Sequence, residues 1–484
     1  MHIQQRHGLF PRILGKGDNA RKLANLLLRG RKELDVEETS TMYSTMPSTN
    51  IESLIIVDRD VDFASMLLTQ LTYEGLIDEL IGIKHNKAEI DSSVIGGAVP
   101  NKAQQSTSST SDTPAPAVRQ SLKRTIQLDS TDSLYSTLRS ANFVRIGPLL
   151  NRTARHLEAE YEKRHAHGIK ELKEFVNKFP AYQQEHQSLT LHTNLADEMS
   201  KHTKSDTFSR QLEVEQNLAA GSDPTYQHDT IEELISRDIP LSTILRMLCL
   251  ESTVSGGLRP RDLENFKRQI LHAYGHQHLL TLDRLEKMEL LQPRSSASAL
   301  LLPVGGGSQP AAGTKTNYAH MRKEFKLIND EYNEIEPEDI SYVFSGYAPL
   351  SIRIVQCVLQ KSFLQSLRPK SPLPLSSTST GWQGFEDILK SAKGPTFNIV
   401  QKATDEKAAR AKASLVGEKG WKTIFVFFLG GITAAEVAAL RFVSKSLEDG
   451  GLRRRIVICT TSMISGRSVM DAVVEKDSLG RKSP

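Results

Sequence analysis

Three aspartates that follow an apolar run are the residues whose types and spacing could support catalysis. Asp58 and Asp60 come directly after residues 54–57, and Asp62 stands two positions further on. A carboxylate at the end of a strand can act as a nucleophile, and a second one can act as an acid or base beside Mg²⁺. Asp58 and Asp60 are therefore candidates for Mg-dependent phosphoryl chemistry.

A haloacid-dehalogenase-like, Mg-dependent phosphohydrolase that uses Asp58 and Asp60 is the alternative function that this spacing allows. Thr460 or Thr461, at the end of a later predicted strand, could supply the hydroxyl that such enzymes use. However, Asp62 stands where these enzymes have a small residue, and no later acidic pair follows a strand to complete the metal site. Capping of the next helix, or bonds to the neighbouring loop, explain the aspartates better, so we expect no enzyme activity.

Histidine spacing raises a second possibility, a metal site. His272 and His276 would share one face of a helix, and His278 lies close to them in the sequence. No cysteine and no third-ligand helix stands at metal-binding spacing, so surface or capping roles explain these histidines better. We therefore expect no metal ion and no other cofactor.

Composition limits the classes of partner. The chain has 484 residues and a net charge of +4, from 61 basic and 57 acidic side chains, and so lacks the concentrated positive field that nucleic-acid binding needs. The most apolar window, residues 424–440, is short and contains Glu436, so no membrane span is expected. Three widely spaced cysteines with apolar neighbours are typical of core residues in a reduced, intracellular protein: Cys249, Cys357 and Cys459.

The elements that position these residues begin with a central strand. Residues 54–57 form an unbroken, mostly β-branched apolar run, which favours a strand covered on both faces. An acidic turn and an amphipathic helix up to Gly82 follow it. The parallel neighbours that such a strand needs are Thr423–Leu429 and Arg455–Thr460, near the other end of the chain. We therefore predict an α/β domain that is split by a long insertion.

The predicted architecture is α/β plus α, with a discontinuous, doubly wound parallel-sheet domain interrupted by a large helical insertion domain. Residues 1–115 form the first part of the α/β domain, residues 116–335 the insertion, and residues 336–484 the second part. The insertion shows helical periodicity with almost no strand-like alternation. It should include a short extended piece around Asp132–Tyr135 and a long helix that begins near Phe143.

The insertion also contains a segment with few apolar residues for its length. A helix over Ile169–Phe179 should end or bend at Pro180, which lacks an N–H, and a more polar helix should follow it. Such a sequence cannot be covered by core on several sides. We therefore expect an elongated hairpin that stands off the body and could receive another helix. A solvated extension without a ligand is the alternative.

Four segments carry a resemblance to a known family. They are LIIVDRDVDFASMLLTQLTYEGLIDE, FVNKFPAYQQEHQSLTLHTNLADEM, SYVFSGYAPLSIRIVQ and IFVFFLGGITAAEVAALRFVSKSLEDGG. These segments resemble the SM family of SNARE regulators, and most of all the SM subunit of the class C vacuolar protein sorting complexes, HOPS and CORVET. In that family a helical domain interrupts a discontinuous α/β domain, in agreement with the split predicted above.

The resemblance implies a function and partners. It implies a cytoplasmic SNARE-binding regulator of vesicle fusion, which templates the assembly of syntaxin-type and R-type SNAREs during transport from endosome to vacuole or lysosome. It also implies a helical class C tethering subunit as a permanent partner, with peripheral membrane association through that complex. Family members begin with a further α/β domain. Because GLFPRILGKGDNARKLANLLLR resembles the start of their second domain, we expect the N-terminal domain to be lacking.

SNARE-binding residues are assigned on two grounds. Three residues match the bend of the family's hairpin, and the resemblance gives them this role: Phe179, Pro180 and Tyr182. Three more are inferred from their helical spacing: Phe175, Leu195 and Met199.

The class C subunit is predicted to dock on residues 274–282. Tyr274, His276 and Leu279 are the candidate contacts, because their spacing leaves them partly exposed. Packing of these side chains inside the helical domain is an equally open alternative.

Overall fold

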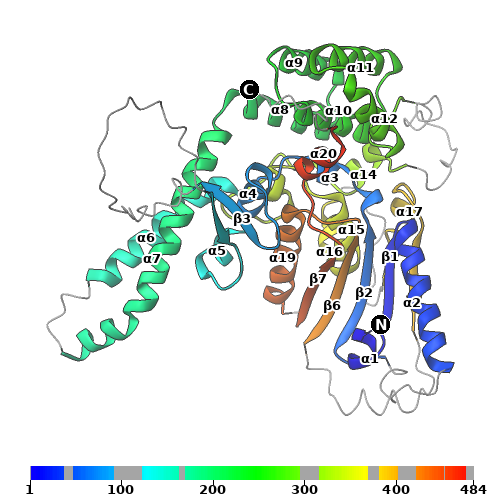
Figure 1. Ribbon diagram of the computed structural model, residues 1–484. Coiled ribbons are helices and arrows are strands. Elements are labelled where there is room, and N and C mark those ends of the chain that lie inside the picture. Colours follow the sequence, from blue (N-terminus) through cyan, green and yellow to red (C-terminus); the bar gives the residue numbers. More distant parts are fainter. Residues whose placement is uncertain are drawn as a thin grey trace, which may run out of the picture.

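The computed structural model describes residues 2–36, 47–91, 123–162, 169–294, 315–368, 381–401, 421–451 and 453–475. Its centre is a five-stranded sheet in the order β5-β1-β2-β6-β7 (Figure 1). The strands span Arg12–Lys16 (β1), Ile51–Asp58 (β2), Thr396–Val400 (β5), Lys422–Leu429 (β6) and Arg454–Thr460 (β7).

β2 lies between two parallel neighbours. Leu54 is opposite Ile13 of β1 on one side and opposite Phe425 of β6 on the other. β6 in turn pairs in parallel with β7. Almost every residue of β2 is buried, as an unbroken apolar run requires. The predicted pairing of residues 54–57 with strands near the other end of the chain is therefore confirmed.

Two strands of this sheet are absent from the sequence-based prediction. β1 places Arg12, Gly15 and Lys16 among only five residues, so its apolar run is too short to recognise. Gly15 is needed because a Cβ there would lie 2.3 Å from the ring of Phe397. Phe397 belongs to β5, which is antiparallel to β1 and forms one edge of the sheet. The sheet is therefore mixed, which corrects the expectation that all its strands are parallel.

Helices cover both faces of the sheet. On one face, Ala20 and Ala24 of α2 (Asp18–Val36) share an apolar cluster with Ile13 and Ile56. The opposite face, which includes Ile55, shares a larger cluster with three helices. They are α3 (Ala64–Leu67), α15 (Leu350–Leu359) and α19 (Ala434–Asp449).

Five helices form a layer above the sheet in the view of Figure 1. They are α8 (Asp206–Ala220), α9 (Pro224–Ser236), α10 (Leu241–Ser255), α11 (Pro260–Tyr274) and α12 (Leu279–Lys287). Buried residues of this layer, such as Leu248 and Phe266, belong to the same core cluster as Ile55 of the sheet. The helical layer and the sheet therefore share one core. The predicted domain boundary near residue 335 stays a prediction, and the one near residue 115 lies outside the described residues.

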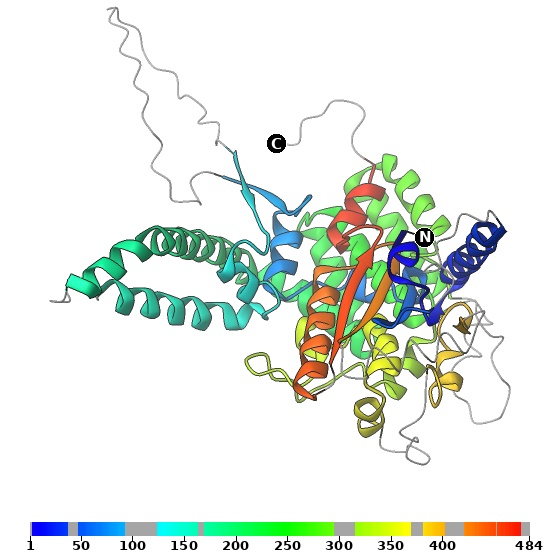
Figure 2. The same ribbon diagram turned by 90° about the horizontal axis from the view of Figure 1, so that it is seen from below.

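The long helices α6 (Ile146–Glu162) and α7 (Ile169–Thr203) lie side by side and project from the molecule (Figures 1 and 2). We call residues 146–162 and 169–190 the arm. At its base lie α4 (Tyr73–Leu80), α5 (Ser133–Leu138) and a two-stranded antiparallel sheet, β3 (Lys87–Asp91) with β4 (Lys123–Gln127). The described residues also include shorter α-helices: α1 (His2–His7), α14 (Tyr318–Glu324), α16 (Lys361–Ser366), α17 (Glu386–Leu389) and α20 (Gly466–Val473).

Three details of the predicted insertion are wrong. α7 continues through Pro180, so the hairpin is formed by α6 with α7 and not by two helices that meet at that proline. The segment Asp132–Tyr135 is not extended, because Asp132 caps α5 by accepting a hydrogen bond from the backbone N–H of Tyr135 at 3.0 Å. β4 is a strand within the region expected to be helical. It carries one apolar residue, Ile126, among charged and polar ones; it pairs with β3 and buries Ile126.

Candidate functional site

The arm carries a row of aromatic rings. On α7, the ring centroid of Tyr182 lies 6.5 Å from that of Phe179 and 6.3 Å from that of His186. Tyr161, on α6, stacks on Tyr182 with a centroid distance of 5.4 Å. We call these four residues the aromatic row. Phe179 is 39% exposed, although burial of its ring would be favourable, so the row presents a partly exposed aromatic surface.

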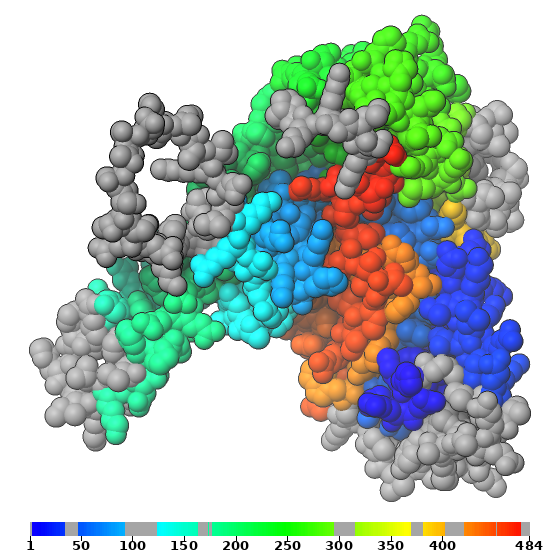
Figure 3. Space-filling model, in the orientation of Figure 1, coloured from blue at the N-terminus to red at the C-terminus, as the bar shows by residue number. Residues whose placement is uncertain are grey.

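The surroundings of the aromatic row are open. Around it the side chains of residues 183–187 are exposed, and Pro180 is exposed as well. In the space-filling view the arm stands clear of the sheet, with an open angle between the two (Figure 3). The site is therefore accessible around residues 179–187.

Two predicted SNARE-binding residues do not belong to this surface. Leu195 and Met199 are almost completely buried and pack in the cluster at the base of the arm. Their helical spacing is that of a core stripe, which corrects their assignment to a binding surface. Phe175 lies in α7, and its side chain is outside the described residues. Tyr161, which sequence reasoning missed, is 21 positions from Tyr182 and meets it only through the packing of α6 on α7.

A second exposed apolar surface lies at α12. Leu279, Leu280 and Met288 are 61%, 55% and 46% exposed, and we call them the α12 patch. Exposure of Leu279 agrees with its predicted docking role, and Leu280 and Met288 were not predicted. His276 is exposed too. Tyr274 is half-buried, and its hydroxyl donates a hydrogen bond to the carbonyl of Ile239, so part of this residue serves the fold.

Two of the three aspartates, Asp58 and Asp62, are held by structural hydrogen bonds, whereas the carboxylate of Asp60 is half-exposed and lies 3.7 Å from Nζ of Lys393. Asp58 accepts from the backbone N–H of Asn19 at 2.8 Å, and burial raises the pKa of its carboxyl group. Asp62 accepts from the backbone N–H of Ser65 at 3.1 Å and of Ser351 at 2.9 Å. Because these carboxylates cap and join loops, the predicted capping role is confirmed. They are not arranged around a common open space, so the geometry gives no support to the phosphohydrolase alternative.

The described residues contain no group of three or more side chains placed to hold a metal ion, and His278 is buried beside Thr281. Within the same part of the chain, no helix is both long and apolar enough to cross a bilayer. Cys249 and Cys357 are buried, as predicted for small core residues.

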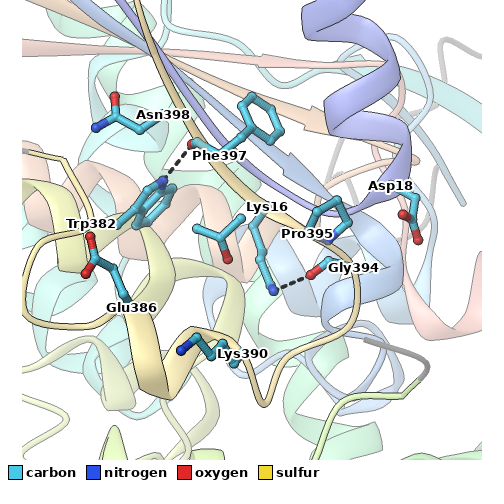
Figure 4. A pocket seen from close by; sticks show the side chains of 10 residues that line it. Lys16, Asp18, Trp382, Glu386, Lys390, Gly394, Pro395, Phe397 and Asn398 are labelled. Atoms are coloured by element: carbon cyan, nitrogen blue, oxygen red, sulfur yellow. Dashed lines mark hydrogen bonds between the residues drawn. The ribbon is translucent and has the colours of Figure 1, made fainter. Parts of the chain in front are cut away.

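A cavity of about 560 Å³ lies between the end of β1 and the loop that precedes β5 (Figure 4). Lys16 reaches into it and donates a hydrogen bond to the carbonyl of Gly394 at 2.5 Å, while Trp382 donates to the carbonyl of Phe397. Burial lowers the pKa of Lys16 from 10.5 to about 8, although the nearby charge of Asp18 opposes this shift. A buried ammonium group with one acceptor destabilises the folded state.

Replacing Lys16 by methionine is therefore expected to stabilise the protein. In the unfolded chain Lys16 keeps its proton up to about pH 10.5, whereas in the folded chain Lys16 loses its proton near pH 8. Burying the charged Lys16 side chain therefore lowers the free energy of unfolding by about 3 kcal/mol below pH 8, and this cost disappears toward pH 10.5. The variant also loses the hydrogen bond to Gly394, which is worth about 1 kcal/mol, so its free energy of unfolding at pH 7 should be about 2 kcal/mol higher than that of the wild type.

Urea denaturation of the wild type and of Lys16→Met between pH 7 and 10 tests this expectation. Wild-type stability should rise with pH above 8, and the variant should lack that rise. Lys390→Met is the matched control, because Lys390 is an exposed residue at the rim of the same cavity. A loss of stability in Lys16→Met at pH 7 would contradict the argument.

Comparison with known proteins finds matches along almost the whole chain. The model of the Sec1 family matches residues 1–472. Over 477 residues the chain is 36% identical to vacuolar protein sorting-associated protein 33A of Rattus norvegicus, with 98% of this chain and 70% of the relative covered. Over 473 residues it is 30% identical to vacuolar protein sorting-associated protein 33 of Schizosaccharomyces pombe, with 98% and 71% covered.

Solved structures share the fold. The SM protein Vps45 in complex with the Qa SNARE Tlg2 has a TM-score of 0.55 at 17% identity, with 96% of this chain and 66% of that chain covered. The Unc18–syntaxin 1 complex from Monosiga brevicollis has a TM-score of 0.58 at 14% identity, with 97% and 69% covered. The chain thus spans about two thirds of the length of these proteins, and the α/β plus α architecture is confirmed as theirs.

Proposed function

Because the chain belongs to the Sec1 family, we propose that it is a SNARE-binding regulator of vesicle fusion in protein transport to the vacuole or lysosome. Similarity to vacuolar protein sorting-associated proteins over 98% of the chain supports the transport step. Similarity to SM proteins that were solved with a Qa SNARE or a syntaxin supports the partner. The observation that carries the proposal is the projecting arm with its exposed aromatic row.

The arm acts as a template on which SNARE segments are aligned. A free SNARE segment is disordered, and ordering its backbone costs about 1–2 kcal/mol per residue. Holding a syntaxin-type and an R-type segment in register on one surface lowers the barrier to their pairing. The aromatic row supplies rigid apolar contacts to helices, at low loss of side-chain entropy. No covalent step is needed, and the finished bundle leaves because its own core outcompetes the arm.

The α12 patch is the docking site of a helical class C tethering subunit. Leu279 and Leu280 are adjacent exposed leucines at the start of α12, of the kind that interfaces bury; exposed His276 precedes them, and exposed Met288 lies at the other end of the helix. Through this subunit the protein joins a HOPS-type or CORVET-type complex and associates peripherally with endosomal and vacuolar or lysosomal membranes. SNARE capture and subunit docking thus use different surfaces.

A reciprocal binding experiment tests the two assignments. Phe179→Asp is expected to weaken SNARE capture about tenfold, because it replaces the exposed ring at one end of the aromatic row by a charge. Leu279→Asp is expected to weaken docking of the class C subunit by a similar factor. The measurement is the affinity of each purified variant for a syntaxin-type SNARE helix, for an R-type SNARE helix and for the class C subunit.

Each variant controls for the other. Phe179→Asp should leave subunit docking unchanged, and Leu279→Asp should leave SNARE capture unchanged. Equal loss of both activities in one variant would indicate unfolding, which circular dichroism would reveal. Wild-type affinity for SNAREs in the folded Phe179→Asp variant would contradict the assignment of the arm as the template.

A further inference from the structure

The base of the arm has an apolar core of its own. Tyr73 and Leu76 of α4, Leu138 of α5, and Leu195 and Met199 of α7 are buried together there. This cluster is separate from the core that joins the sheet to the helical layer. The contacts that hold the arm to the body are therefore concentrated in one small region.

A buried polar relay crosses this region. His192 of α7 is fully buried, and its Nδ1 lies 2.9 Å from the hydroxyl oxygen of Tyr73 on α4. Its Nε2 lies 3.1 Å from Oδ2 of Asp132, the capping residue of α5. Ser188, one turn earlier on α7, donates to the same Oδ2 at 2.6 Å. Each polar atom of the imidazole ring thus has one partner from another element of the body.

The ionisation states of Asp132 and Tyr73 indicate the direction of their hydrogen bonds with His192. Burial works against ionisation of Asp132, but hydrogen bonds from His192 and Ser188 outweigh it and hold the pKa of the carboxyl group well below its usual value. Burial raises the pKa of the Tyr73 hydroxyl, which therefore stays a donor. In the tautomer protonated on Nε2, the ring N–H of His192 donates a hydrogen bond to Asp132, and Nδ1 accepts one from the Tyr73 hydroxyl.

The relay makes the packing of α7 specific for one register, which the apolar contacts alone do not. Leucine and methionine side chains pack well in several neighbouring registers, since dispersion forces are not directional. Hydrogen bonds from two different elements to the two ring nitrogens are satisfied in one register only, and a slipped α7 would bury His192 and Asp132 without partners. The ring of Tyr135 stacks on His192 at a centroid distance of 5.8 Å and limits its rotation further.

We propose that the relay of Tyr73, His192 and Asp132 fixes the direction of the arm relative to the body, and that these residues position the SNARE template without touching a SNARE. The second part rests on the function proposed above. The relay lies at the base of the arm, and the three aromatic-row residues of α7 lie beyond it, 6–13 residues nearer the N-terminus. A small rotation at the base moves the row by a larger distance, because α7 is a continuous lever of 35 residues.

Distance distributions between two spin labels measure this directly. Labels on Lys178→Cys in the arm and Lys445→Cys on α19 report the direction of the arm, and both positions are exposed. Half-exposed Cys459 is replaced by serine in every chain so that it takes no label. We compare the otherwise unchanged protein with Tyr73→Phe and His192→Leu. Thr193→Ala, an exposed neighbour on the same helix, is the matched control.

The unchanged protein and Thr193→Ala should give one narrow distribution. Tyr73→Phe removes a single hydroxyl and should widen the distribution at least twofold, and His192→Leu should widen it more. Circular dichroism confirms that both variants fold. A distribution that stays narrow in both folded variants would overturn the proposal and leave the relay a purely stabilising feature. A wide distribution in the unchanged protein would also overturn it.

Because the spin-label experiment uses the protein without any SNARE, its outcome is independent of the proposed function. The rate of SNARE assembly in the presence of the same variants then tests the positioning role. If the arm loosens, assembly should slow several-fold although the aromatic row is intact. A loosened arm with unchanged assembly would refute the positioning role alone, whereas unchanged SNARE capture in Phe179→Asp would refute the template.

Discussion

Replacing Glu436 by glutamine is expected to lower the free energy of unfolding by about 3–5 kcal/mol. Glu436 is fully buried on α19 and accepts hydrogen bonds from both terminal nitrogens of Arg59, at 2.8 and 3.0 Å. Its carboxylate also accepts from Thr433 and from Ser351. Glutamine keeps the shape of the side chain but points an NH₂ group at donors, and it leaves the buried charge of Arg59 poorly compensated.

The effect should depend on pH. Burial alone raises the pKa of Glu436, but the charge of Arg59 and its hydrogen bonds outweigh burial and hold the pKa below the usual 4.5. A carboxyl group with a lowered folded-state pKa stabilises the protein above its unfolded-state pKa, and this stabilisation is lost as the pH falls. Wild-type stability should therefore decline below about pH 4.5 more steeply than that of the variant.

Urea denaturation at pH 7 and at pH 4 measures both effects. Glu448→Gln is the matched control, because Glu448 is exposed on the same helix and should change stability by less than about 0.5 kcal/mol. If Glu436→Gln behaves like that control, the ion pair with Arg59 does not hold α19 to the end of β2.

The sequence predicts the parts of this fold whose physics is local. The unbroken apolar run 54–57 identifies the central strand, and the run at 423–429 identifies its neighbour, because strands buried on both faces need apolar residues at every position. The scarcity of apolar residues after Ile169 predicts a projecting segment, because a helix with few apolar residues cannot be covered by core on several sides. Each of these signals is contained in a window of about ten residues.

Features that depend on distant contacts were missed or misassigned. β1 is short and carries Lys16, and its strand conformation depends on pairing with β2 and β5. Leu195 and Met199 have the spacing of an exposed stripe as much as of a buried one, and only contact with α4 and α5 decides that they are core. Tyr161 joins the aromatic row through the packing of α6 on α7. Helical periodicity identifies a face, and tertiary structure decides what covers it.

Replacing Arg246 by methionine is expected to destabilise the protein by a similar amount, about 3–5 kcal/mol, for a different reason. Arg246 of α10 donates to both oxygens of Glu79, at 2.9 and 3.0 Å, and lies 3.9 Å from Glu215 of α8. All three side chains are buried. The variant leaves two carboxylates in the core without their cation, so the ion-pair interactions that join α10 to α4 and α8 are lost.

The deficit of Arg246→Met should also become smaller as the pH falls, but here because a buried carboxylate of the variant takes up a proton. Burial raises the pKa of Glu215, and the charge of Arg246 limits that rise. Without Arg246 the pKa should rise further, so that Glu215 takes up a proton in the folded state. A carboxyl group with a raised folded-state pKa stabilises the fold at low pH and loses that contribution as the pH rises. The deficit of Arg246→Met should therefore shrink from pH 7 to pH 5.

Two further variants separate charge from packing. Arg237→Met removes a half-exposed arginine that pairs with Asp206 and Glu233, and it should change stability by less than about 1 kcal/mol. Adding Glu79→Met to Arg246→Met should restore part of the loss, because an apolar pair of similar volume needs no counter-ion. If the double variant is less stable than Arg246→Met at both pH values, packing and not the unpaired charge accounts for the loss.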